Sequence, residues 1–132
     1  MPLLAPAQRR QIYSPEAPPP IGPYSQGVLA GNTLYVAGQI GLVGSTGQLQ
    51  NASIRAETTQ VMNNLAAILK AASMDFSHVV KVTIYLKDLA DFGAVNAVYA
   101  EFFKDNPPAR ETVQVAALPR GAALEISCVA VK

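Results

Sequence analysis

Apolar and polar residues alternate along several short stretches of the chain, and this spacing predicts β-strands. Residues 28–30 and 33–37 form two such stretches, and Gly31-Asn32 between them is typical of a hairpin turn because both residue types tolerate positive φ. From Val79 to Lys87 the alternation predicts a strand that covers Val80, Val82, Ile84 and Leu86 and leaves its other face wetter. Two further strands are predicted at residues 112–117 and 123–131.

Apolar residues three and four positions apart predict two helices. The first runs from about Ser53 to Ala72, with Ser53 or Asn51 as its N-cap. Asp88 can cap the second helix, and Pro107-Pro108 ends it and sends the chain into an extended segment. The apolar side of this second helix carries Phe92, Val95, Tyr99, Phe102 and Phe103.

This order of elements predicts an α+β fold with a mixed sheet and both helices on one face. The other sheet face then needs a cover, and half of the 132 residues are hydrophobic while only 14% are charged. Because exposed apolar patches usually mark contact surfaces, we expect a homo-oligomer. Pro15 and the run Pro18-Pro19-Pro20 favour extended backbone, so we expect a flexible tail at 1–17 and a single domain at 18–132.

Composition narrows the classes of function. Ten basic and nine acidic residues give a net charge of +1 without charge runs, so we expect no nucleic-acid partner. Cys128 and His78 are single residues of their kind, which predicts neither a disulfide framework nor a metal cluster. No apolar stretch approaches the roughly 20 residues that span a bilayer. Arg9 and Arg10 in an acid-free start faintly resemble an organelle transit segment, but a tail on a cytoplasmic protein is the preferred interpretation, with mitochondria as the alternative.

Two charged residues are candidates for chemistry. Arg110 follows Pro107-Pro108-Ala109, which fixes the direction of its backbone, and a guanidinium can grip a carboxylate with two parallel hydrogen bonds. Glu125 is the only acid between Gly121 and Lys132, and partial burial would raise its pKa towards that of a useful general base. The alternatives from local sequence are an ordinary surface arginine and a solvated carboxylate at a sheet edge.

Two polar residues are weaker candidates. Tyr24 lies in a Gly-Pro-Tyr-Ser turn that could hold it at the mouth of a pocket, and Asn96 lies beside the apolar stripe of the second helix, where a solvated amide is the alternative. Ser25 lacks the Gly-x-Ser-x-Gly sequence of a nucleophile elbow. Catalysis therefore has to rest on an arginine, a carboxylate and water, without a metal or other cofactor.

From about residue 17 to 132 the chain resembles the RidA/YjgF family of reactive-intermediate deaminases. The motifs that carry this resemblance run in family order along the chain. They are Ile21-Gly22-Pro23-Tyr24-Ser25-Gln26, residues 34–40, residues 79–83, Asp91-Phe92 with Val95-Asn96 and Tyr99, Phe102-Phe103, Pro108-Ala109-Arg110 and the strand pair within Val113 to Val131.

The resemblance implies a chorismate-mutase-like α+β fold that assembles as a homotrimer with clefts between subunits. It implies that Arg110 binds the substrate carboxylate, that Glu125 orients the attacking water, and that Tyr24 and Asn96 bind substrate. The implied reaction is hydrolysis of 2-imino acids and their enamine tautomers, such as 2-iminobutanoate and 2-iminopropanoate, to 2-keto acids and ammonia. Pyridoxal-phosphate enzymes such as threonine dehydratase release these substrates.

Four residues, at three places in the chain, depart from the family pattern. Ala37 replaces a usual serine, Glu111 and Thr112 follow Arg110 where small residues or Ser-Cys are common, and Ser127 replaces a frequent second glutamate. These changes leave open a non-catalytic, small-carboxylate-binding or regulatory trimer of the same fold. A ribonuclease or translation inhibitor is a third possibility, against which the near-neutral charge and the lone histidine argue.

Overall fold

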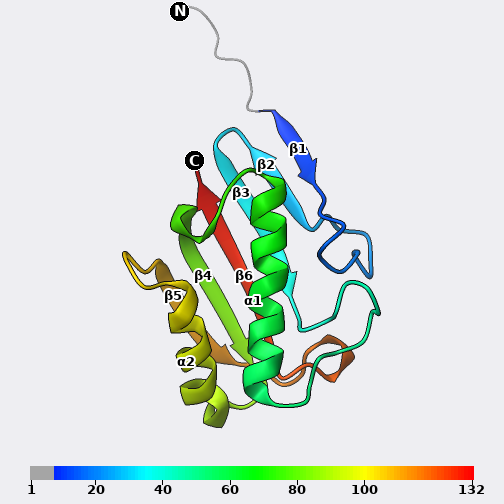
Figure 1. The fold of residues 1–132 in the computed structure, drawn as a ribbon, viewed down its shortest axis with the longest axis vertical. Coiled ribbons are helices and arrows are strands. Elements are labelled where there is room, and N and C mark those ends of the chain that lie inside the picture. Colours follow the sequence, from blue (N-terminus) through cyan, green and yellow to red (C-terminus); the bar gives the residue numbers. More distant parts are fainter. Residues whose placement is uncertain (1–7) are drawn as a thin grey trace, which may run out of the picture.

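A computed structural model describes residues 8–132 and arranges six strands in one mixed sheet, with both long helices on the same face (Figure 1). The strands lie in the order β1-β2-β3-β6-β4-β5; β4 and β5 are parallel and all other pairs are antiparallel. The predicted mixed α+β architecture is confirmed. The strands are β1 (Arg9–Ile12), β2 (Gly27–Ala30), β3 (Thr33–Gln39), β4 (Val79–Leu86), β5 (Ala109–Gln114) and β6 (Leu124–Val131), and the helices are α1 (Ile54–Ala71) and α2 (Phe92–Phe102).

The core forms between α1, α2 and one face of the sheet. Alternate residues of β6 point into it, because side chains along a strand face opposite sides of the sheet. Leu124, Ile126, Cys128 and Ala130 are buried there, whereas Glu125, Ser127 and Val129 point to the other face and are only half-buried. The face without helices is called the open face below.

Local sequence signals account for the helix starts and the first hairpin. The Ser53 hydroxyl accepts a hydrogen bond from the backbone N–H of Ala56, so Ser53 is the N-cap of α1. The hairpin between β2 and β3 turns at Gly31, which has a φ of 60°, a conformation that glycine adopts without strain. Asp88 caps a short 3₁₀ turn at Leu89–Asp91 that leads directly into α2.

The segment before residue 18 is not a tail over its described part. Residues 9–12 form β1, which pairs antiparallel with β2, and Ile12 and Ala17 are buried. The side chain of Gln26 is buried and holds this segment: it accepts from the N–H of Ser14 at 2.6 Å and donates to the carbonyls of Ser14 and Pro18. The prediction of a tail through residue 17 is therefore wrong for residues 9–17, and residues 1–7 lie outside the described part of the chain.

Two strands differ from their predicted course. A bulge between Val79 and Lys81 shifts the register of β4 against β6, so Val79 is buried and Val80 is 49% exposed, contrary to the simple alternation. Strand β5 starts at Ala109 rather than Thr112, because its first residues already pair in parallel with β4. Arg110 thus lies within the sheet, directly beside Val82.

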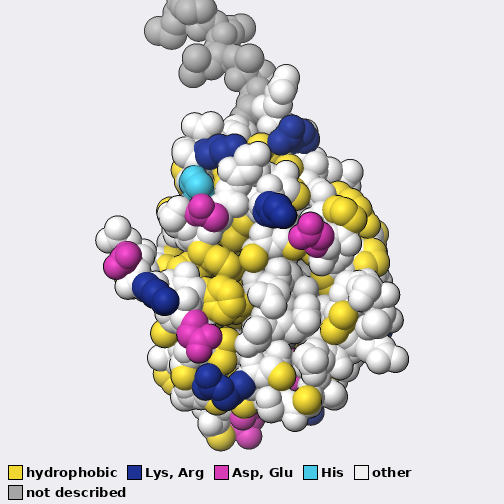
Figure 2. Space-filling model, in the orientation of Figure 1, with side chains coloured by type: hydrophobic (Ala, Val, Ile, Leu, Met, Phe, Trp, Pro, Cys, Tyr) yellow, Lys and Arg dark blue, Asp and Glu magenta, His cyan; other side chains and the backbone are white. Residues whose placement is uncertain are grey.

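Charged side chains of both signs are mixed with hydrophobic ones on the face that carries the helices (Figure 2). The open face carries large apolar side chains that are about half exposed, among them Tyr35, Val113 and Val131. This distribution agrees with a sheet face that another subunit covers. Within residues 8–132, neither helix has the length and hydropathy needed to cross a bilayer.

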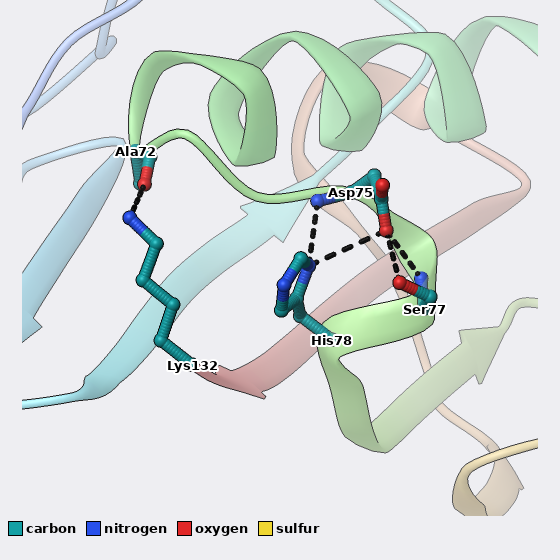
Figure 3. A network of polar contacts seen from close by, with 5 residues as sticks. All are labelled: Ala72, Asp75, Ser77, His78 and Lys132. Carbon is teal, nitrogen blue, oxygen red and sulfur yellow. Dashed lines mark hydrogen bonds and ion pairs between the residues drawn. The ribbon is translucent and has the colours of Figure 1, made fainter.

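Short-range polar contacts close the connection between α1 and β4 (Figure 3). The Asp75 side chain accepts from the N–H of Ser77, and Nδ1 of His78 accepts from the N–H of Asp75, which together form a capping box. Nearby, the ammonium of Lys132 donates to the carbonyl of Ala72 at the end of α1. His78 therefore has a local structural role.

Candidate functional site

Arg110 points to the helix side of the sheet and contacts α2. Its register partner Val82 is a core residue, and neighbours in a sheet share a face. Nη1 of Arg110 donates to Oδ1 of Asn96 at 2.7 Å. The guanidinium carbon lies 4.8 Å from the ring centre of Tyr99 and 5.6 Å from that of Phe92. Two rings and one amide of α2 thus hold the guanidinium.

These three contacts come from one face of α2. Phe92, Asn96 and Tyr99 are four and three residues apart, a spacing that stacks side chains along a helix. The apolar stripe predicted from the sequence includes both aromatic residues, but their contact with Arg110 was missed. The position of Asn96 in the same i, i+4, i+7 series is the signal that could have revealed it.

An open cleft of about 360 Å³ lies beside the guanidinium. Its walls are mainly apolar, and the guanidinium and the Asn96 amide are its polar groups. Such a combination suits a small carboxylate with a short apolar chain. The residues that line this cleft, called the Arg110 cleft below, are Asn96, Tyr99, Ala100, Phe103, Pro107, Pro108 and Arg110.

Glu125 points to the open face, where its register partner on β4 is Tyr85. The backbone of Gly38 lies against its side chain, and the carboxylate is half-buried. Burial raises the pKa of Glu125 above its ordinary value of 4.5. A carboxylate with a raised pKa is better matched to proton transfer near neutral pH.

Tyr24 also belongs to the open face. It lies in the loop before β2, is 46% exposed, and its hydroxyl accepts from the N–H of Ile21 at 3.2 Å. A broad cleft of about 700 Å³ beside it is lined by Arg9, Tyr35 and Ala37 among others. The hydroxyl that Ala37 lacks would therefore have been near this cleft.

The four candidate residues form two groups in one chain. Arg110 and Asn96 contact each other on the helix side of the sheet, whereas Glu125 and Tyr24 lie on its open face. Because residues paired across strands share a face, the Arg110 side chain and the Glu125 side chain point to opposite sides. One chain therefore does not bring the predicted carboxylate-binding residue and the predicted base to one cavity.

Glu111 does not neutralise Arg110, although the two residues are adjacent in sequence. Its carboxylate points to the open face, accepts a hydrogen bond from the Thr83 hydroxyl and lies 2.9 Å from the ammonium of Lys81. The hydrogen bond from Thr83 and the contact with Lys81 hold the pKa of Glu111 below its ordinary value. This departure from the family pattern leaves the Arg110 cleft without a competing negative charge from Glu111.

Two buried polar or reactive groups lie apart from these clefts. Glu57 on α1 is 4% exposed and accepts from the N–H of Ala123 at 2.7 Å, a role that the helical pattern did not reveal. Cys128 is a buried free thiol, and burial raises its pKa to about 12. Among residues 8–132, no three His, Cys, Asp or Glu side chains come together as a metal-binding group.

Comparisons with known proteins agree with the fold and with the motifs. The family model described as endoribonuclease L-PSP matches residues 14–132. A human protein named 2-iminobutanoate/2-iminopropanoate deaminase is 49% identical over 124 residues, which cover 94% of this chain and 90% of the human protein. A Pyrococcus horikoshii protein named as a RutC family protein is 47% identical over 92% of this chain and 96% of its own length.

Crystal structures of other proteins have the same fold as this chain. A crystal structure of a Thermotoga maritima protein described as an endoribonuclease has a TM-score of 0.91 and 44% identity, over 93% of this chain and 97% of that one. Escherichia coli TdcF, crystallised with bound serine, has a TM-score of 0.90 and 36% identity over 93% and 98% of the two chains. The match of the family model to 119 consecutive residues (14 to 132) and these relatives show that the chain belongs to the endoribonuclease L-PSP family, which includes the RidA proteins.

Proposed function

We propose that this protein hydrolyses small 2-imino acids, and their enamine tautomers, to 2-keto acids and ammonia. The observation that carries the proposal is the Arg110 guanidinium, held by Asn96 beside a cleft with apolar walls. The human relative named 2-iminobutanoate/2-iminopropanoate deaminase supports the same substrate class. The serine bound to Escherichia coli TdcF supports a site for a small α-carboxylate in this family.

Arg110 recognises the carboxylate and thereby fixes the position of the neighbouring imine carbon. A guanidinium has five N–H donors, and the hydrogen bond to Asn96 uses one of them. The remaining edge is available for two parallel hydrogen bonds to a carboxylate. Holding the reacting carbon in place replaces part of the entropic cost of bringing substrate and water together.

Glu125 supplies proton transfer. In the first step it accepts a proton from water while the water oxygen bonds to the imine carbon and the C=N π electrons move to nitrogen. It then returns that proton to nitrogen, which gives a neutral carbinolamine. Glu125 next accepts the hydroxyl proton and passes it to nitrogen as the C–N bond breaks and the C=O bond forms, so ammonia and the 2-keto acid leave and the carboxylate is regenerated. A positioned base of this kind is worth about 10² to 10⁴ in rate.

Two copies of the chain complete one site. Arg110 and Glu125 point to opposite sides of the sheet, so a cavity that contains both needs the helix side of one copy and the open face of another. A contact between two different faces closes into a ring when its rotation permits. A homotrimer with three such contacts also covers the exposed apolar side chains of the open face.

The chemistry of the substrate places the reaction after another enzyme. Free imino acids form where a pyridoxal-phosphate-dependent dehydratase eliminates water from a hydroxy amino acid. We therefore expect this protein to act on the product of an enzyme such as threonine dehydratase, without a cofactor of its own.

Mixing of inactive variants tests both the reaction and the shared site. Arg110→Ala and Glu125→Gln are each expected to lose the acceleration of 2-keto acid release in a reaction coupled to threonine dehydratase. When the two variants are unfolded, mixed and reassembled, sites with one intact Arg110 and one intact Glu125 form, and random mixing restores about a quarter of the wild-type activity. The double variant, reassembled alone, is the control and stays inactive. Wild-type rates for Arg110→Ala would end the proposal.

Ribonuclease activity is less well supported, although the matching family model carries that description. Basic and acidic side chains are interspersed on the face that Figure 2 shows, and the net charge is +1. A protein that binds the phosphate backbone of RNA usually has a continuous basic surface. RNA cleavage that survives purification and is lost in Arg110→Ala would favour this alternative.

A further inference from the structure

The hydroxyl of Tyr99 is buried and has no hydrogen-bond partner among residues 8–132. Most buried polar groups in proteins are hydrogen-bonded, because an unpaired one loses its bonds to water without replacement. The Tyr99 side chain belongs to α2, is 5% exposed as a residue and lines the Arg110 cleft with part of its ring. An unpaired hydroxyl at this position needs an explanation.

The Arg110 guanidinium is the adjacent group that could satisfy this hydroxyl. Its central carbon lies 4.8 Å from the centre of the Tyr99 ring, and within residues 8–132 one of its N–H groups is hydrogen-bonded, to Asn96. Burial raises the pKa of Tyr99, and the positive charge of Arg110 together with the approach of its N–H groups to the hydroxyl opposes that rise, so the two groups lie within reach of each other although their geometry does not yet form a hydrogen bond. The hydroxyl can accept but Arg110 can only donate, so the pair is complementary.

We propose that Tyr99 is a positioning residue for Arg110: its ring sets the plane of the guanidinium, and its hydroxyl accepts an N–H from the guanidinium when substrate carboxylate occupies the other edge. This inference rests on the proposed function of Arg110. The hydroxyl itself is closed off from solvent, so it acts through Arg110 and does not touch the substrate.

The arrangement explains why Asn96 alone would not suffice. One hydrogen bond to Nη1 leaves the guanidinium free to turn about that contact. The Tyr99 hydroxyl would be a second acceptor, and the Tyr99 ring packs against the guanidinium. Together they define the plane of the guanidinium and the direction in which its free N–H groups point. Two parallel bonds to a carboxylate require that definition.

Tyr99→Phe tests this inference because it removes the hydroxyl and keeps the ring. Thr112→Val is the matched control: the Thr112 hydroxyl is also buried without a partner within residues 8–132, but Thr112 does not line the Arg110 cleft. We expect Tyr99→Phe to raise KM about tenfold with kcat within about twofold, the loss expected for one hydrogen bond to a charged group. Thr112→Val should leave both constants unchanged.

Thermal unfolding with 2-oxobutanoate, a product of the proposed reaction, gives a second readout. Tyr99→Phe should lose most of the increase in Tm that this ligand gives to the wild type, while its Tm without ligand stays equal or rises. A merely structural tyrosine would instead lower the Tm without ligand and leave the increase intact. In an Arg110→Lys background, Tyr99→Phe should have no further effect on KM, because the hydroxyl acts through the guanidinium.

The two proposals fail in different ways. If 2-oxobutanoate does not stabilise the wild type, or stabilises Arg110→Ala equally, the proposed function fails. If the wild type responds, Arg110→Ala does not, and Tyr99→Phe behaves like the wild type in KM and in ligand stabilisation, only the role of Tyr99 is overturned.

Discussion

Gly38 lies so close to the Glu125 carboxylate that a Cβ atom on residue 38 would be 2.5 Å from Oε2. Real Cβ atoms do not approach other atoms this closely, so only glycine leaves room for the carboxylate in this position. The contact lies where the pairing of β3 with β6 is irregular, between Val36 and Gln39. This irregularity lets a half-buried carboxylate press against the backbone of the neighbouring strand, which favours its raised pKa.

Gly38→Ala is expected to displace the Glu125 side chain and to lower kcat by about 10² or more, because a misplaced base loses most of its contribution. The fold should persist, since the flexible end of the carboxylate can move away. Steady-state kinetics and circular dichroism check this result.

Gly93→Ala is the control, because nothing lies within 4 Å of its added Cβ. It should keep full activity and gain up to about 1 kcal/mol of stability from helix propensity. Normal kcat in Gly38→Ala would contradict a role for the Glu125 position.

The decrease of kcat/KM at acidic pH should reflect protonation of Glu125. A general base must be ionised, and burial raises the pKa of Glu125 above 4.5, so kcat/KM should fall as the pH drops through that raised value. Glu125→Gln should lose the acceleration at every pH tested. Initial rates of 2-keto acid release, measured with excess dehydratase at each pH, test the expectation. An acid limb centred at or below 4.5 would contradict the assignment.

Glu57 should make stability depend on pH. Burial raises the pKa of Glu57, so the folded protein holds its proton more tightly than the unfolded chain does. The resulting stabilisation is complete below the unfolded pKa, near 4.5, and is lost as the pH rises through the folded pKa.

Glu57→Gln should remove this dependence, because an amide oxygen can still accept from Ala123 but does not ionise. Glu57→Ala should instead lose about 1–3 kcal/mol, since the N–H of Ala123 loses its partner. Thermal unfolding of the three proteins between about pH 4 and pH 8 distinguishes these outcomes. A Glu57→Gln variant that follows the wild-type curve would show that another group controls the dependence.

The Gln26 side chain should determine whether the segment from β1 to residue 18 stays packed against the rest of the sheet. Gln26→Ala removes three hydrogen bonds to Ser14 and Pro18 and leaves these backbone groups unpaired, at a cost of about 2–3 kcal/mol. Hydrogen exchange of amides 9–17 should accelerate more than that of β4 and β6. Gln11→Ala is the control, because among residues 8–132 the Gln11 side chain makes a single hydrogen bond, an exposed one to Ser25. Equal exchange in both variants would contradict this role.

Patterns within a few residues of sequence correctly predicted the start of α1 and the turn between β2 and β3. Ser53 as an N-cap and the Gly31 turn follow from backbone preferences of single residues. Strand β1 was missed because Ile12 is the only buried residue in Arg-Arg-Gln-Ile, so the strand carries almost no apolar pattern. Its pairing depends on β2, fifteen or more residues later.

In the candidate site, too, local sequence indicated individual residues but not their arrangement in space. The proline pair before Arg110 and the isolation of Glu125 in its strand pointed to both residues. Their separation onto opposite faces could not be predicted, because it depends on β5 starting at Ala109 and pairing in parallel with β4. The contacts of Phe92 and Tyr99 with Arg110 depend on that register as well.

The position of β6 has a consequence for biosynthesis. β6 lies between β3 and β4, and it is the element through which the two halves of the sheet are joined. Among the described strands β6 is made last, so the emerging chain holds the antiparallel strands β1-β2-β3 and the parallel pair β4-β5 before the strand that joins them is available. The sheet can be completed only when β6 has left the exit tunnel, and a nascent chain arrested before Leu124 should remain sensitive to protease.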